Sequence, residues 1–199
     1  MDGLIIEGVA GTGKSTIVSG LRDSNSFKRL KPSFKIIYEE LTTGELVAEL
    51  RDERLSDQDR YSRLTQLMPT IQTRQASGEF LVLERFHPTF FALMPKCTLF
   101  ESFDQQLLKL NFGLVLLDFP NNNFGDRSFF RPEMENQNWS KNLIDWYGSQ
   151  EASILAFIES QERRRKFLEV TKLKSILIDT SERNWEAYIK SIIKFVAEQ

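Results

Sequence analysis

The sequence of 199 residues has one cysteine, one histidine and no long apolar run. Because a single cysteine, Cys97, excludes an internal disulfide, the composition fits a reducing compartment. No segment is apolar enough to span a bilayer, and the apolar run near the N-terminus is too short for a signal peptide. A net charge of −2 provides no basic excess for nucleic acids or anionic membranes. We therefore expect a cytoplasmic protein without a nucleic-acid or membrane partner.

The chain instead has the composition of a globular protein, with 41% hydrophobic and 27% charged residues. This length is enough to bury a sizeable core, and we expect one domain across residues 1–199. Five short apolar runs predict strands, at residues 4–7, 34–38, 80–83, 114–117 and 175–178. None alternates between polar and apolar residues, so each is expected to be buried on both faces.

Helical segments separate these runs, at residues 14–22, 44–51, 57–76, 99–110, 140–170 and from about 181 to the end. We expect a kink at Pro69 in the third segment and an N-cap at Thr180 or Ser181 in the last. Alternating strands and helices predict an α/β fold, a doubly wound five-stranded parallel sheet with helices on both faces. Ligands of such sheets bind at the carboxyl ends of the strands.

The strongest motif directly follows the first predicted strand. Residues 8–15, Gly-Val-Ala-Gly-Thr-Gly-Lys-Ser, match the phosphate-binding pattern G-x-x-x-x-G-K-[ST]. Glycines allow backbone N–H groups to approach phosphate oxygens, Lys14 adds positive charge, and the Ser15 hydroxyl suits Mg²⁺. The motif predicts that a nucleoside triphosphate with Mg²⁺ binds to seven residues: Gly8, Gly11, Thr12, Gly13, Lys14, Ser15 and Thr16.

Charged residues follow the second and third predicted strands. Glu84 ends the third run, where phosphate-loop enzymes place an acidic Mg²⁺ ligand, so we expect Glu84 and Ser15 to hold the metal. Arg85 is suited to binding a phosphate or a carboxylate in two-point geometry. Glu39 and Glu40 follow the second strand, and either one is a candidate general base for an acceptor hydroxyl.

Two further arginines, Arg127 and Arg131, lie in a turn-rich segment at about 120–139. Arginines on such a lid can close over the transferring phosphoryl group and exclude water. The basic cluster at 163–166 lies inside a predicted helix and is interpreted mainly as a solvated helix face. We interpret His87 as structural or peripheral, because phosphoryl transfer does not require a histidine.

Together, these motifs resemble the thymidylate kinase and deoxynucleoside kinase superfamily over essentially the whole chain. Glu84-Arg85 matches the Glu-Arg of deoxynucleoside kinases, where thymidylate kinases carry Asp-Arg, and Phe86 differs from both. Glu39 matches the acidic residue that lies beside the acceptor hydroxyl, without its flanking prolines. Arg63 falls at the position of a base-reading arginine of thymidylate kinases, without the glutamine that accompanies it there.

The resemblance implies a P-loop kinase with an Arg-bearing lid, and its members are often homodimers. It implies substrate-binding roles for Glu39, Arg63 and Arg85. The implied catalytic residues are Lys14, Glu39, Glu84, Arg85, Arg127 and Arg131.

The favoured function is an ATP-dependent kinase that transfers the γ-phosphoryl group to a nucleoside or a nucleoside monophosphate. Tyr61 or Phe91 is a candidate for holding the base. Two alternatives remain open, a kinase of a small non-nucleoside acceptor and a non-catalytic regulatory protein that binds nucleotides. The acceptor, and the choice between ATP and GTP as donor, are left open by the sequence.

Overall fold

A computed structural model describes residues 1–39, 41–42, 56–93, 100–131 and 138–198. Its sheet has five strands, β1 (Gly3–Glu7), β2 (Phe34–Ile37), β3 (Phe80–Glu84), β4 (Phe112–Asp118) and β5 (Lys174–Asp179). The strand order is β2-β3-β1-β4-β5, and every neighbouring pair is parallel. The predicted parallel sheet is confirmed, with each strand within two residues of its expected bounds.

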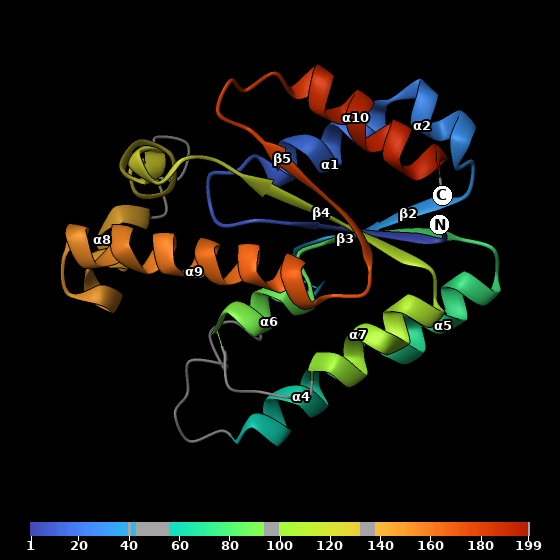
Figure 1. Ribbon diagram of the computed structural model, residues 1–199, viewed down its shortest axis with the longest axis horizontal. Helices are drawn as coiled ribbons and strands as arrows, with labels where there is room; N and C mark the ends of the chain where they lie inside the picture. The colour runs from blue at the N-terminus through green and yellow to red at the C-terminus, as the bar shows by residue number, and fades with distance from the viewer. Residues whose placement is uncertain (40, 43–55, 94–99, 132–137, 199) are drawn as a thin grey trace.

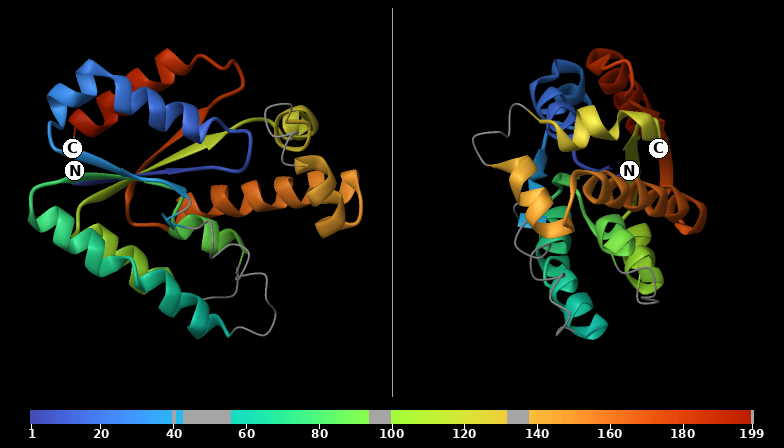
Figure 2. Two further views of the ribbon diagram at one scale, coloured as in Figure 1. Left: turned by 180° about the vertical axis from the view of Figure 1, so that it is seen from behind. Right: turned by 90° about the vertical axis from the view of Figure 1, so that its left-hand side faces the viewer.

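Helices cover both faces of this sheet (Figure 1). One layer contains α1 (Lys14–Asp23), α2 (Asn25–Leu30) and α10 (Trp185–Ala197). The other contains α5 (Met68–Ala76), α6 (His87–Leu93), α7 (Phe100–Lys109) and α9 (Gln150–Val170). Figure 2 shows the two layers from behind and from the side.

The central strand explains why the apolar runs lack alternation. Leu4 and Ile6 of β1 pack into the core beneath α1 and α10, whereas Ile5 packs into the core on the other face. All three side chains are fully buried, so apolar residues are needed on both faces of this strand.

The two edge strands differ from this expectation. In β2 no residue is fully buried, and in β5 the side chain of Leu177 is 53% exposed. The prediction that all five strands are buried on both faces is therefore wrong for β2 and β5. An edge strand has a neighbour on one side only and lies at the margin of the helix layers.

Two predicted helices are each divided in two. The segment 57–76 forms α4 (Asp57–Thr65) and α5, and Pro69 lies in the first turn of α5, where its missing N–H costs little. The break therefore precedes Pro69 and is not a kink at it. The segment 140–170 forms α8 (Trp139–Tyr147) and α9, separated at Gly148, whose φ of +88° ends α8.

The last helix begins later than predicted. Its N-cap is Asn184, whose side chain accepts a hydrogen bond from the Ala187 N–H, and neither Thr180 nor Ser181 has this role. The predicted helix at 44–51 lies outside the described residues.

The carboxyl ends of the strands point toward α8 and toward two short helical turns, η2 (Asn121–Asn123) and η3 (Gly125–Phe129), while both termini lie at the opposite end of the sheet (Figure 1). The phosphate-binding motif connects β1 to α1 at the carboxyl end. Among the helices of the described ranges, none combines the length and apolarity needed to cross a membrane.

Candidate functional site

The phosphate-binding motif forms a tightly packed loop whose glycines are needed for conformation and space. Gly11 and Gly13 have φ values of +84° and +89°, which favour glycine. A Cβ on Gly11 would lie 2.0 Å from the carbonyl oxygen of Arg127. A Cβ on Gly13 would lie 2.4 Å from the Trp185 ring. The loop is therefore closely packed between η3 and the start of α10.

The carbonyl oxygen of Val9 organises the interior of the loop. It accepts hydrogen bonds from the Thr12 hydroxyl at 2.9 Å and from the Lys14 Nζ at 3.0 Å. The Lys14 side chain is buried. Burial, followed by the positive charge of Arg85, lowers the pKa of Lys14 to about 7, although the carboxylates of Glu39, Glu7 and Glu84 oppose this shift. A bound anion would therefore favour the charged form of Lys14.

Ser15 and Glu84 meet as the sequence predicts. The Ser15 hydroxyl donates a hydrogen bond of 2.7 Å to the Oε1 atom of Glu84. Glu84 ends β3 and is 4% exposed, and its backbone carbonyl accepts a hydrogen bond of 2.6 Å from the Thr42 hydroxyl. A hydroxyl and a carboxylate side by side are oxygen ligands that suit Mg²⁺. Within the described ranges, no three His, Cys, Asp or Glu side chains form a metal-binding group of their own.

Arg85 and Glu39 form an ion pair next to this oxygen pair. The Nη1 atom of Arg85 lies 2.7 Å from the Oε1 atom of Glu39, and one third of the Glu39 side chain remains exposed. Arg85 has a φ of +57°, a conformation that costs a non-glycine residue about 1 kcal/mol or more. Backbone strain of this kind is concentrated at functional sites, where surrounding contacts maintain it. Glu40 lies outside the described residues.

Arg127 lies behind the loop and is 7% exposed. Its guanidinium donates hydrogen bonds to the carbonyl oxygens of Thr180, at 2.9 Å, and Gly11, at 3.1 Å, and lies over the Phe119 ring. Burial and the nearby charge of Arg183 lower the pKa of Arg127. In this arrangement Arg127 ties the loop to the end of β5.

Arg131 lies over the Trp139 ring of α8, with its guanidinium carbon 5.6 Å from the ring centroid. Residues 132–137 of the predicted lid lie outside the described ranges. The roles of Arg127 and Arg131 as lid arginines remain predictions.

The residues predicted to hold a base lie farther along the chain. Arg63 belongs to α4, and its side chain is outside the described part of the structure. Tyr61 packs edge-to-face on Phe103, and Phe91 packs on Phe100 and Phe167. Both rings lie against the hydrophobic core, where they pack α4 and α6 against α7 and α9.

The basic cluster of α9 is the main correction to the sequence interpretation. Arg164 is 3% exposed, and its Nε atom lies 3.0 Å from the carboxylate of Glu7, which is fully buried. Arg165 pairs with Asp118, at 2.7 Å, and Arg163 donates a hydrogen bond to the carbonyl of Ala92. The interpretation as a solvated helix face is therefore wrong for Arg164, which is buried, whereas Lys166 of the same cluster is exposed. Glu7 could have indicated a buried arginine in the sequence, because a carboxylate that ends a buried apolar strand needs a charged or hydrogen-bonding partner.

His87 has the structural role that was predicted. It is fully buried, and its Nε2 atom lies 3.1 Å from Asp104. Asp104 also accepts hydrogen bonds from the Thr171 hydroxyl and the Lys172 N–H. This group joins α6 and α7 to the end of α9.

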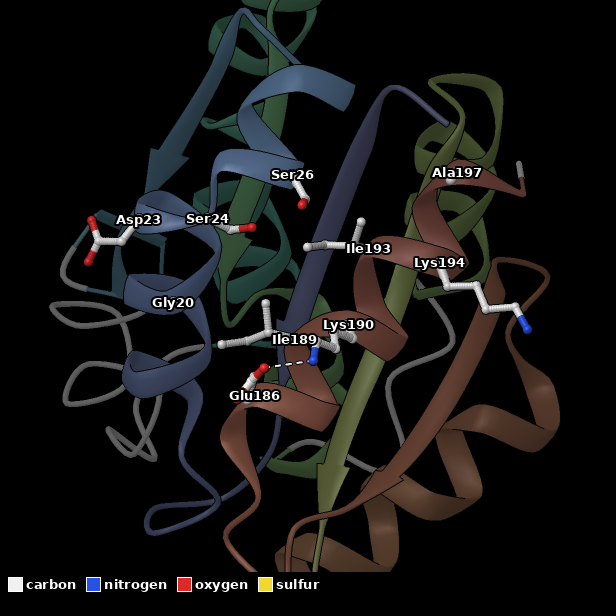
Figure 3. A pocket seen from close by; sticks show the side chains of 10 residues that line it. All are labelled: Gly20, Asp23, Ser24, Ser26, Glu186, Ile189, Lys190, Ile193, Lys194 and Ala197. Atoms are coloured by element: carbon white, nitrogen blue, oxygen red, sulfur yellow. Dashed lines mark hydrogen bonds and ion pairs between the residues drawn. The ribbon is translucent and has the colours of Figure 1, made fainter.

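A separate groove of about 590 Å³ lies between α10 and the helices α1 and α2 (Figure 3). Gly20, Ile189 and Ile193 are among the residues that line it. It contains none of the predicted site residues, so the chemistry gathered at the strand ends lies elsewhere. The candidate site is the loop together with Glu39, Glu84 and Arg85.

Comparisons with known proteins show the fold. No protein-family model matches the chain, and no curated protein is significantly similar to it. Among solved structures, the chain is similar to the YorR protein of Bacillus subtilis, crystallised in complex with phosphorylated GDP. The TM-score is 0.61 with 16% sequence identity, and the match covers 98% of this chain and 95% of that one. At this identity, the similarity establishes a shared α/β fold.

Proposed function

We propose that this protein is a kinase that transfers the γ-phosphoryl group of ATP, or of a similar nucleoside triphosphate, to a nucleoside or a nucleoside monophosphate. One observation carries the proposal. The phosphate-binding loop, the Ser15–Glu84 oxygen pair and the Glu39–Arg85 ion pair lie together at the carboxyl end of one parallel sheet. Residues suited to the donor, the metal and the acceptor are thus adjacent.

The donor triphosphate would bind along the loop at the start of α1. Backbone N–H groups of a glycine-rich turn and of a helix start are unpaired donors that favour an anion. Lys14 would add its positive charge to the β- and γ-phosphates. The solved structure of YorR with phosphorylated GDP supports testing a guanine nucleotide beside ATP.

Ser15 and Glu84 would hold Mg²⁺. Their two oxygens are hard ligands of the kind that this ion prefers, and phosphate oxygens and water usually complete its coordination. When bound, the ion supplies positive charge to the phosphates. The proposal is supported by the position of Glu84 at the end of β3, where the Thr42 hydroxyl donates a hydrogen bond to its backbone carbonyl.

Glu39 would orient the acceptor hydroxyl and accept its proton. The Glu39 side chain is partly exposed, so an acceptor can reach it, and the ion pair with Arg85 fixes the direction of the carboxylate. Arg85 would also lie close to the phosphoryl group as it moves, adding positive charge at that point. The strained backbone of Arg85 fits a residue that is held in one functional orientation.

A kinase of a small non-nucleoside acceptor is the second candidate, because the proposed role of the Glu39–Arg85 pair requires a hydroxyl on the acceptor and does not require a base. The test is transfer of radiolabelled γ-phosphate from ATP or GTP to a panel of nucleosides, nucleoside monophosphates and small alcohols. The proposal predicts transfer to at least one nucleoside or monophosphate, with Mg²⁺ required. Transfer only to a non-nucleoside would support the second candidate, and tight triphosphate binding without any transfer would support a regulatory protein.

A further inference from the structure

The inner face of α9 presents two buried polar side chains to the phosphate-binding loop. Gln161 is fully buried and Arg164 is 3% exposed, although both residue types are usually found at the surface. They lie three positions apart, on one side of the helix. A buried polar group lowers stability unless it is hydrogen-bonded, so the partners of these two residues show what they hold in place.

Arg164 binds the carboxylate of Glu7, the residue that directly precedes the loop. Its Nε atom donates to Oε1 of Glu7 at 3.0 Å, and its Nη2 atom donates to the Thr89 hydroxyl at 3.0 Å. The same carboxylate accepts hydrogen bonds from the Gly8 N–H, at 2.9 Å, and from the Phe86 N–H, at 3.3 Å. One ion pair therefore links the first amide of the phosphate loop to the turn that follows Glu84.

Gln161 holds the second amide of the loop. Its Oε1 atom accepts a hydrogen bond from the Val9 N–H at 3.2 Å. Its Nε2 atom donates to the carbonyl of Leu117, at 3.2 Å, and to the Asp118 carboxylate, at 2.9 Å. If the Gln161 amide were rotated by 180°, its NH₂ group would face the Val9 N–H donor and its oxygen would face the Asp118 carboxylate. The hydrogen-bond network therefore specifies one orientation of the Gln161 amide.

The N–H and C=O groups of Val9, which belong to the two peptide units on either side of its Cα atom, are thus both hydrogen-bonded. Gln161 binds the N–H group from outside the loop, and Lys14 and Thr12 bind the carbonyl from within. A change in the backbone dihedral angles of Val9 would move its carbonyl away from Lys14. The position of the Val9 carbonyl, and with it the hydrogen bond to the Lys14 ammonium, is therefore linked to Gln161 of α9, 152 positions beyond Val9.

We propose that Gln161 and Arg164 are positioning residues, which set the geometry of the phosphate-binding loop and thereby its affinity for the triphosphate. The inference rests on the proposed function only for the identity of the ligand. The hydrogen bonds that hold the loop do not depend on that function. A merely structural role would predict a different outcome. Loss of either side chain would then lower the free energy of unfolding and leave the affinity of the folded protein unchanged.

The first test is Gln161→Met, which keeps the length of the side chain and removes its hydrogen bonds. The control is Lys166→Met, the same residue type introduced on the exposed side of α9. The Kd for Mg²⁺-ATP and Mg²⁺-GTP is measured by calorimetry well below the melting temperature of each variant. We expect Gln161→Met to raise the Kd about tenfold, and Lys166→Met to leave it within about twofold.

The second measurement needs no ligand. Amide hydrogen exchange is followed at residues 11–15, whose N–H groups Gln161 does not contact, and at α10 as an internal reference. Faster exchange at residues 11–15 in Gln161→Met, with α10 unchanged, supports positioning. If the wild-type protein binds neither triphosphate, the proposed function fails, and this comparison still decides the inference. Unchanged exchange, or a Kd within twofold of wild type in a folded variant, overturns it.

Arg164→Lys provides an independent test if Gln161→Met fails to fold. Lysine keeps the charge opposite Glu7 but lacks the planar group that also reaches Thr89 and Ser160. We expect a folded protein with faster exchange at residues 11–15 and a Kd raised about fivefold. Wild-type exchange and affinity in this variant would overturn the proposal for Arg164.

Discussion

The affinity for Mg²⁺-ATP should fall steeply as the pH rises above neutrality, because of Lys14. Burial and the charge of Arg85 lower the pKa of this ammonium to about 7 in the free protein. A bound triphosphate would favour the charged form and return the pKa toward the ordinary lysine value of about 10.4. Binding would therefore take up a proton wherever the pH lies between these two values.

The magnitude follows from the two pKa values. About half of the Lys14 side chains are protonated at pH 7 and about 1% at pH 9, given a pKa of about 7. The association constant should then fall about 50-fold between pH 7 and 9, which is about 2.3 kcal/mol. The free energy of unfolding should change in the opposite sense over this range. It rises with pH, because the unfolded chain retains a proton that the folded chain releases.

The assay is isothermal titration calorimetry with Mg²⁺-ATP at pH 7, 8 and 9, in two buffers of different protonation enthalpy. At pH 8 we expect uptake of about 0.9 proton per complex. Phosphate groups, with a second pKa of about 6, are already ionised at this pH and contribute little. Lys14→Arg is the matched control, because arginine stays charged and should flatten the pH dependence. A constant affinity without proton uptake in the wild-type protein would refute the reasoning.

Three further predictions concern single side chains. Glu39→Gln should lower kcat by about 10²- to 10⁴-fold and leave the Kd for Mg²⁺-ATP unchanged. A variant whose affinity for Mg²⁺-ATP falls by the same factor as kcat would argue against a base role. Glu84→Gln should raise the Mg²⁺ concentration for half-maximal activity about tenfold, whereas the control Glu79→Gln should not. The same Mg²⁺ dependence in Glu84→Gln and the wild-type protein would show that Glu84 does not bind the metal. Arg164→Met should lower the free energy of unfolding by about 3–5 kcal/mol in urea titrations, because it leaves Glu7 buried without its cation. Lys166→Met should change that free energy by less than about 0.5 kcal/mol, and similar losses in both would contradict the buried ion pair.

The features that were predictable from the sequence are local ones. Apolar runs separated by helical segments sufficed to predict the five-stranded parallel sheet, because burial on both faces excludes most polar residues from its three inner strands. The phosphate-binding loop was equally visible, since contiguous residues build it and its glycines are required by backbone geometry. The pairing of Ser15 with Glu84 followed from one general rule, that the carboxyl ends of parallel strands lie together.

The helix boundaries were less accessible, because they depend on tertiary contacts. No proline interrupts the segment 140–170, yet the chain turns at Gly148 so that α8 packs against η3 and α9. Likewise, the last helix starts at Trp185, where the indole ring packs on Gly13 of the phosphate loop. Neither contact has a local signature in the sequence.

Charge alone did not reveal which arginines are buried. Arg163, Arg164 and Arg165 are adjacent and chemically identical, but only the direction of α9 across the sheet turns Arg164 toward Glu7, 157 positions away. In the same way, the packing of η3 turns Arg127 inward onto Gly11 and Thr180. The sequence by itself thus determined the sheet and the glycine-rich loop, which contiguous residues encode. The tertiary structure alone decided which distant charges meet, because that depends on how helices cross the sheet.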